Sequence, residues 1–261
     1  KQQNSLPLVI TNDDMKATTD DEKSNMFLNY FESKTNKPRT IGRPFNGKKI
    51  LLPNNSPIFT PESLDRAIKE TKPKQSFGFD RVPMKALIDS YTKSRPVLLS
   101  LFEKIESEKM IPNKWKISRV IPVFKKGDKS LTCNYRPISN LCSLAKIMEK
   151  MILYHMLDQA ALSGVDLTGK SQFGFKKHSS TATLTLLLQE KIALALDKNE
   201  ESGLASLDLT AAFDLVDHKL LFERMKILGV SEITRKLTKD WLSNRKHYVE
   251  IGMSSSKSTP L

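Results

Sequence analysis

The chain has 261 residues, of which 39% are hydrophobic and 27% are charged. This apolar content is enough for a sizeable core and excludes a wholly disordered chain. Lys and Arg number 42 against 29 Asp and Glu, so the formal net charge is +13. At roughly 150 residues per domain, the length predicts one large domain or two lobes.

The excess positive charge is concentrated in two segments. Residues 34–60 carry six basic and no acidic side chains, and residues 111–150 carry nine basic and two acidic ones. Concentrated positive charge is typical of a surface that meets a polyanion, either nucleic acid or an acidic membrane. The sequence favours nucleic acid, because no apolar run approaches the ~20 residues that span a bilayer. No polybasic amphipathic helix is evident either.

The two cysteines, Cys133 and Cys142, do not form a CxxC pair. The sequence therefore predicts neither a disulfide framework nor a zinc site, and it indicates a reduced, intracellular protein. The chain begins at Lys1 without an initiator Met or a signal peptide, which predicts a piece of a longer protein.

The first third of the chain is predicted to be mostly connector and helix. Residues 1–57 are polar, acidic at the start and then interrupted by Pro and Gly, so we expect a connector with one short helix near Met26–Phe31. Thr60 is a hydroxyl N-cap followed by Pro at the first helical position, which predicts a helix start. Pro96 is expected to interrupt or restart the helical pattern of residues 87–105.

The rest of the chain alternates between strand and helix patterns. Residues 115–124 (WKISRVIPVF) are β-branched and aromatic, and with residues 135–138 they predict a basic β-hairpin around a KKGD turn. Further helices are expected from Ser143 to Gly164, after Ser180 with an apolar face, and at 219–228 and 232–242, and further strands at 204–209 and 247–253. Helices interleaved with strands, without a strict βαβ repeat, predict an α+β protein.

The most informative stretch is LASLDLTAAFDLVDHKLL at residues 204–221. Asp208 lies near the end of the expected apolar strand, where an unpaired carboxylate is costly, so it should coordinate a cation or lie at an opening of the core. The alternative is a helix cap. Asp214, Asp217 and His218 have helical spacing, and we favour a hydrogen-bonded orienting pair over a second metal site.

This stretch resembles motif A of the reverse transcriptases of non-LTR (LINE-type, jockey-like) retrotransposons. Five further blocks resemble the same family in order, namely NYF at 29–31, FGFDRVP at 77–83, IPVFKKGDKSLTCNYRPISNL at 121–141, SQFGFKKHSSTATL at 171–184 and WLSNRKHYVEIG at 241–252. The resemblance implies a right-hand polymerase fold. Residues 58–203 would form the fingers with N-terminal helices, and residues 204–261 would form the first part of the palm.

The resemblance also implies a two-metal nucleotidyl transfer onto a primer 3′ hydroxyl, with RNA as the template. Asp208 would be the catalytic ligand of two Mg²⁺ ions, with Mn²⁺ as a possible substitute and the Leu209 carbonyl as a further ligand. The backbone amides of residues 210–212 (Thr210, Ala211 and Ala212) would contact the triphosphate. Phe213 would be a steric gate against a ribonucleotide 2′ hydroxyl, and core packing is its alternative role.

Two further groups of side chains are assigned by the same resemblance. Lys125, Lys126 and Arg136 would bind the phosphates of the incoming nucleotide, and the alternative is a solvated surface turn. The residues expected beside the template and the nucleotide pocket are Gln172, Gly174, Phe175 and Lys176.

The implied partners are an RNA template, a DNA primer and deoxynucleoside triphosphates, with no membrane, in a ribonucleoprotein of the nucleus and cytoplasm. The family's Tyr-x-Asp-Asp motif does not occur in the sequence, so these 261 residues alone are predicted to be inactive. Three interpretations stay open. The chain is a fragment of an active reverse transcriptase, a decayed remnant that serves at most as a basic nucleic-acid-binding module, or a different metal-dependent phosphotransferase.

Overall fold

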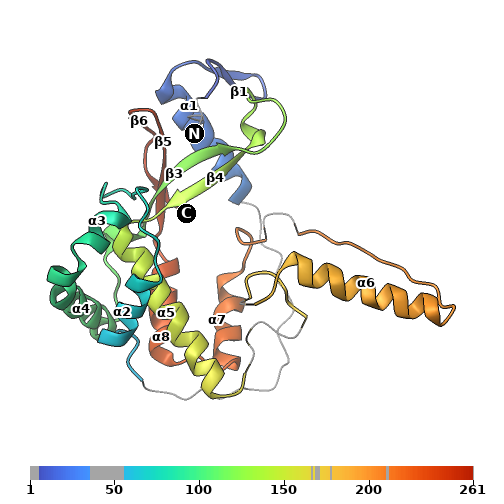
Figure 1. Ribbon diagram of the computed structural model, residues 1–261. Coiled ribbons are helices and arrows are strands. Elements are labelled where there is room, and N and C mark those ends of the chain that lie inside the picture. Colours follow the sequence, from blue (N-terminus) through green and yellow to red (C-terminus); the bar gives the residue numbers. More distant parts are fainter. Residues whose placement is uncertain are drawn as a thin grey trace.

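The protein combines a small sheet, covered by one helix, with a cluster of helices below it (Figure 1). The structure is a computed structural model and describes residues 6–35, 56–165, 167, 171–176, 178–209 and 212–260. This mixture of helices and sheet confirms the α+β prediction. Within the described residues, no helix is both long and apolar enough to cross a membrane.

The helices and strands alternate along the chain. The strands are β1 (Ile10–Asn12), β2 (Met15–Ala17), β3 (Ile117–Phe124), β4 (Tyr135–Asn140), β5 (Lys246–Ile251), β6 (Ser254–Ser255) and β7 (Thr259–Pro260). The α-helices are α1 (Asp20–Thr35), α2 (Pro61–Lys69), α3 (Met84–Asp89), α4 (Tyr91–Glu108), α5 (Ser143–Leu162), α6 (Thr181–Asp197), α7 (His218–Ile227) and α8 (Glu232–Leu242). Two short 3-10 helices, η1 (Asn113–Lys116) and η2 (Thr132–Asn134), precede β3 and β4.

Strand β3 is central, because it pairs with β4 on one side and with β5 on the other. The β3–β4 pair is antiparallel, with Phe124 opposite Tyr135 and Val120 opposite Ser139. The β3–β5 pair is parallel, with Val120 opposite Val249, and β6 and β7 pair with β5 in the antiparallel sense. The predicted hairpin is confirmed. The strand predicted at 247–253 is present as β5, but it ends at Ile251 and the short strands β6 and β7 follow it.

Helix α1 covers one face of this sheet. Phe27 is completely buried, and its ring lies 5.6 Å from that of Phe31 and 5.0 Å from that of Tyr135, between ring centroids. The sequence predicted only a short helix near Met26–Phe31 within a connector. The helix is longer and carries core residues, because its aromatic side chains pack against a sheet that forms later in the chain.

The helical cluster has its own core, in which Phe102 of α4 lies between two other rings. The centroid distances are 5.4 Å to Phe59 and 5.9 Å to Trp115. Thr60 caps α2, as the sequence predicted, and the cap is a reciprocal capping box with Ser63. The predicted bounds of α8 agree with the structure.

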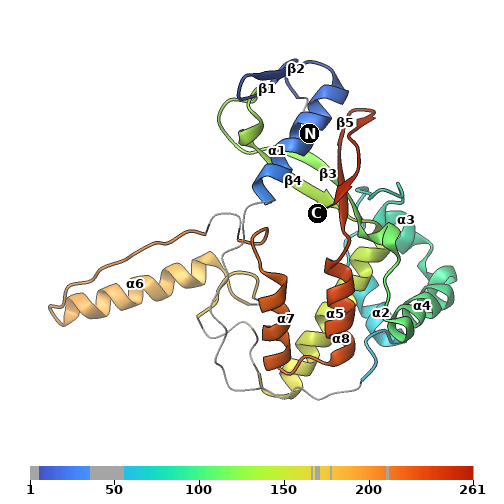
Figure 2. The same ribbon diagram turned by 180° about the vertical axis from the view of Figure 1, so that it is seen from behind.

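Two sequence predictions about local structure are wrong. Pro96 lies inside α4, and the helical pattern is interrupted at Ser90 instead. Pro96 is tolerated because it stands in the second turn of α4, where its missing N–H removes one backbone hydrogen bond. The strand expected at 204–209 is also absent, and these residues form no ladder and are exposed. These residues run beside the projecting helix α6, away from the sheet (Figures 1 and 2), so the apolar pattern has no strand to pair with there.

Helix α6 differs from its prediction in packing but not in position. It starts after Ser180, which forms a capping box with Thr183. The sequence predicted an apolar face, which would normally be buried, yet none of the helix's described side chains is buried. Figures 1 and 2 show α6 projecting from the body as an arm, with the chain of residues 200–209 returning beside it. An apolar stripe indicates what a helix can bury but not whether a neighbour is present.

The FGFD turn packs closely against the end of the hairpin at Gly78. A Cβ atom at this position would lie 2.4 Å from the backbone nitrogen of Cys142. Beside it, the guanidinium of Arg119 lies 4.4 Å from the Phe77 ring centroid and donates to Glu250 of β5 at 2.7 Å. The turn therefore joins two sequence blocks that are far apart in the chain.

We predict that Gly78→Ala lowers the free energy of unfolding by about 1–3 kcal/mol, because the new methyl group forces two backbone segments apart. Urea denaturation measures this change. Gly174→Ala is the matched control, since a Cβ there meets nothing within 4 Å, and it should leave stability unchanged or slightly raised. Equal effects of the two substitutions would show that the close approach at Gly78 is unimportant.

Candidate functional site

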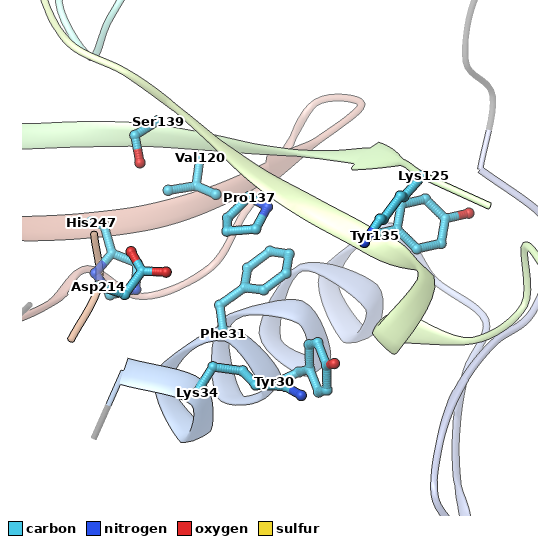
Figure 3. A pocket seen from close by; sticks show the side chains of 10 residues that line it. All are labelled: Tyr30, Phe31, Lys34, Val120, Lys125, Tyr135, Pro137, Ser139, Asp214 and His247. Atoms are coloured by element: carbon cyan, nitrogen blue, oxygen red, sulfur yellow. The ribbon is translucent and has the colours of Figure 1, made fainter. Parts of the chain in front are cut away.

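A pocket of about 350 Å³ lies between α1, the β3–β4 hairpin and β5 (Figure 3). Helix α1 contributes Tyr30, Phe31 and Lys34 to its wall, and the segment before α7 contributes Asp214. The hairpin contributes Lys125, among others, and β5 contributes His247. The pocket thus draws on the NYF, hairpin, motif A and C-terminal blocks.

The register of the hairpin decides which side chains reach this pocket. Val120, Tyr135, Pro137 and Ser139 line it, because they share the face of the sheet that α1 covers. Arg136 lies opposite Val123, one residue out of phase with that set, so it is on the other face of the sheet and is exposed.

The turn that carries the predicted lysines is held by hydrogen bonds. The Lys125 backbone N–H donates to the Asn134 carbonyl at 2.8 Å, and Gly127 has φ of 88°. The Asp128 carboxylate accepts from the backbone N–H and the hydroxyl of Ser130, both at 2.8 Å. These bonds lower the pKa of Asp128. The backbone of the turn is therefore held in one conformation.

The three predicted phosphate ligands do not converge on one point. Lys125 lines the pocket and Lys126 is exposed beside it on the turn, whereas Arg136 is on the opposite face. A second cation of the pocket comes from α1, where the Lys34 ammonium lies 5.0 Å from the Tyr30 ring centroid. Sequence reasoning noticed the NYF block but gave no role to Lys34.

Motif A is split between two places. Asp208 and Leu209 are exposed on the segment that returns beside α6, whereas Asp214 reaches the pocket. Thr210 and Ala211 lie outside the described residues, and Ala212 is exposed.

The structure brings two predicted aromatic residues together. The rings of Phe175 and Phe213 meet edge to face with centroids 6.3 Å apart, although both side chains are largely exposed. The predicted template residues next to Phe175 are ordered locally, since Gln172 donates to the Gly174 carbonyl at 2.9 Å. The Lys176 carbonyl accepts from Ser179 at 3.2 Å.

The predicted metal ligands fit Mg²⁺ in kind but do not make up a complete site. Carboxylate and carbonyl oxygens, as in Asp208 and Leu209, are the ligands that Mg²⁺ prefers. However, the part of the chain that the structure describes contains no group of three or more His, Cys, Asp or Glu side chains able to hold an ion. Near motif A, Asp217 caps α7 by accepting from the Leu220 N–H at 3.1 Å, which is a structural role.

Comparison with known proteins assigns the chain to a family. Residues 123–260, more than half of the chain, match the family described as "Reverse transcriptase (RNA-dependent DNA polymerase)". The chain belongs to the reverse transcriptase family. The match includes the hairpin from Val123 onward, motif A and β5, which are three of the four sources of the pocket.

Relatives of this reverse transcriptase chain come from mobile elements. It is 26% identical over 248 residues to "Probable RNA-directed DNA polymerase from transposon BS" of Drosophila melanogaster, covering 92% of this chain and 27% of the relative. It is 25% identical over 251 residues to "RNA-directed DNA polymerase from mobile element jockey" of Drosophila funebris, covering 91% and 27%.

A retrotransposable element with another name is also similar. The chain is 27% identical over 194 residues to "Retrovirus-related Pol polyprotein from type-1 retrotransposable element R2" of Popillia japonica, covering 74% of this chain and 26% of the relative. The chain thus spans about a quarter of the length of these relatives. The predicted resemblance to non-LTR retrotransposon reverse transcriptases is confirmed.

His247, in the wall of the pocket, makes the stability of the fold depend on pH. Burial lowers its pKa below the ordinary value of 6.5, against the opposing charge of Glu32, and its Nδ1 atom is buried without a hydrogen-bond partner among the described residues. His247 is therefore protonated less readily in the folded state than in the unfolded state. The stability from neutral His247 is complete above pH 6.5 and is lost as the pH falls toward the lowered folded pKa.

We predict that the free energy of unfolding decreases between about pH 7.5 and about pH 5.5, by at most about 1.4 kcal/mol per pH unit for this histidine. Urea denaturation at both pH values measures the decrease. His155, whose pKa burial also lowers, contributes with the same sign, so His247→Gln should reduce the decrease without removing it. An identical decrease in the variant would contradict the assignment.

Proposed function

We propose that the chain forms the fingers and the first part of the palm of the RNA-directed DNA polymerase of a non-LTR retrotransposon. We further propose that its pocket receives the incoming deoxynucleoside triphosphate. The observation that carries the second proposal is the convergence of four family-like blocks on one pocket, with Lys125 and Lys34 in its wall. Relatives named as RNA-directed DNA polymerases support the first.

The pocket is chemically suited to a nucleotide. A triphosphate is strongly anionic, and ammonium groups such as those of Lys125 and Lys34 attract it and donate hydrogen bonds to its oxygens. The rings of Tyr30, Phe31 and Tyr135 offer apolar walls for a sugar or a base. Lys126 is the further phosphate ligand on the same turn.

Arg136 needs a separate role in this proposal. It lies on the face of the hairpin away from the pocket, so it would contact phosphate from that side, as the nucleotide or template passes the end of the hairpin. Its planar guanidinium suits a bidentate contact with a phosphate group.

Asp208 and the Leu209 carbonyl would hold Mg²⁺, or Mn²⁺ in its place, with further ligands that the described residues do not provide. Two such ions would stabilise the charges on the attacking 3′ hydroxyl and the leaving pyrophosphate. The chain's own contribution is to bind and orient the substrate. The backbone amides of Thr210, Ala211 and Ala212 would contact the triphosphate.

Phe213 would be the steric gate, and its edge-to-face contact with Phe175 supports a place for both rings beside the nucleotide. Gln172, Gly174, Phe175 and Lys176 would border the template. The partners would be an RNA template and a DNA primer, in a ribonucleoprotein of the nucleus and cytoplasm.

The second candidate function is nucleic-acid binding without catalysis. The net charge of +13 and its concentration favour it equally. Under both functions we expect no primer extension by these 261 residues alone, because motif A without a Tyr-x-Asp-Asp carboxylate provides too few ligands for two ions. Nucleotide binding and synthesis in a complete polymerase separate the two candidates.

We predict that Lys125→Ala weakens binding of a fluorescent deoxynucleoside triphosphate by about tenfold, because a charged hydrogen bond to phosphate is lost. Fluorescence titration of the chain measures this affinity. Lys93→Ala removes an equal charge from an exposed position on α4 and should have little effect. Equal losses in both variants would assign binding to net charge and would argue against the pocket.

We predict that Asp208→Asn abolishes DNA synthesis when this chain replaces the matching segment of the jockey polymerase of Drosophila funebris. The amide cannot replace a charged metal ligand, whereas template binding does not need it. Primer extension and RNA binding are measured together, and Asp197→Asn, an exposed carboxylate at the end of α6, is the control. Retained synthesis in the Asp208 variant would refute its assignment as a metal ligand.

A further inference from the structure

A second hollow, of about 560 Å³, lies between α7 and α8. The first pocket, between α1, the hairpin and β5, is called the pocket beneath α1, and it shares no lining residue with this hollow. In both views α7 and α8 lie at the end of the molecule away from the hairpin (Figures 1 and 2). We call this hollow the α7–α8 groove.

The two helices present the same spacing of side chains to the α7–α8 groove. The lining residues are Lys219, Phe222, Glu223 and Lys226 of α7 and Glu232, Arg235, Lys236 and Lys239 of α8. In each helix they follow the order i, i+3, i+4 and i+7, which is one face of an α-helix. The inward faces carry other residues, among them Leu237, which is buried in the core of the helical cluster, and Met225, which is buried in a smaller cluster with Ala160 and Val230. Each helix therefore lines the groove with one row of side chains on its outward face.

The outer faces of α7 and α8 bring together positive charge that a charge count along the sequence does not reveal. The described residues that line the groove include five basic and two acidic side chains, a net charge of +3. The whole segment of residues 201–261 has a net charge of only +1. Glu232 is already paired with Lys236 at 2.6 Å. The Arg235 Nε–H donates to the Val230 carbonyl at 3.0 Å, which fixes this guanidinium at the start of α8.

We infer that the α7–α8 groove binds the phosphate backbone of a single-stranded nucleic acid. Its cations are all donors, as phosphate oxygens require. On α7, Lys219 and Lys226 are seven positions apart, which separates them by about 10 Å along the helix. On α8, Arg235, Lys236 and Lys239 are grouped within about 6 Å along the axis. The half-buried Phe222 offers one ring on which a base can stack.

An acidic protein helix is the competing occupant, and the lining argues against it. A helix that docks in a groove is held by apolar anchors at i, i+3 and i+7, and among the described residues only Phe222 gives this groove an apolar side chain. A nucleic-acid strand needs no such anchors, because its affinity comes from charge and stacking. The inference goes beyond the proposed polymerase site, since it concerns a strand held away from the nucleotide pocket.

The test measures binding of a labelled poly(U) RNA of about 20 nucleotides to the chain, at salt concentrations from about 50 to about 200 mM. The groove variant is Lys226→Gln/Lys236→Gln/Lys239→Gln. Its matched control is Lys69→Gln/Lys93→Gln/Lys104→Gln, which removes the same charge from exposed positions on α2 and α4. No nucleotide or primer is present, so the result does not depend on the polymerase assignment.

We expect the groove variant to bind RNA at least about tenfold more weakly than the control, with a salt slope lower by about 2, since each lost phosphate contact on a single strand removes about 0.7. The slope distinguishes lost contacts from partial unfolding, which thermal melting checks. A poly(dT) strand of equal length shows whether RNA or DNA is preferred. Equal weakening in both variants, or an unchanged slope in the groove variant, would overturn the inference. Stronger groove-dependent binding of polyglutamate than of either strand would overturn it in favour of an acidic protein.

Discussion

The ion pair between Lys116, just before β3, and Asp240, near the end of α8, joins two distant segments of the chain. The Lys116 side chain is only 2% exposed, and its Nζ atom lies 2.9 Å from Asp240 Oδ2. The same oxygen accepts from the Ile111 backbone N–H at 2.8 Å. A buried ammonium without such a partner would be costly, so this contact holds α8 against the entry to β3. Residues more than a hundred positions apart are joined by one carboxylate.

The position of β5 follows from this contact. Trp241, next to Asp240, donates to Glu149 of α5 at 2.9 Å, so the end of α8 is held from two sides. Burial raises the pKa of Glu149, although this hydrogen bond opposes the shift. The chain then enters β5, which lies parallel to β3 and brings His247 to the pocket beneath α1. The site therefore depends on an ion pair that lies outside it.

The two proposed binding surfaces arise from different physical causes. The pocket beneath α1 forms because sheet register places alternate residues of the hairpin on one face, which includes Tyr135 and excludes Arg136. The α7–α8 groove forms because helical periodicity aligns basic residues on the outer faces of two neighbouring helices. Counting charge along the chain identified the hairpin segment but missed the groove, where basic residues are interspersed with acidic ones in the sequence.

The sequence by itself determined the local elements and the family. The β-branched residues of β3, the Thr60 cap of α2 and the bounds of α8 were all predictable, because their signals lie within a few neighbouring residues. The ordered blocks likewise carried the reverse transcriptase resemblance, which the comparisons confirm.

Only the tertiary structure decided which of these signals lead to burial or to contact. The apolar pattern of residues 204–209 predicts a strand, but these residues are exposed. Helix α6 has an apolar face that no described neighbour covers. Lys34 and His247 join Lys125 in one pocket although they come from opposite ends of the chain. A local pattern states what a segment can bury or bind, whereas its partners are set by long-range packing, which no short stretch of sequence encodes.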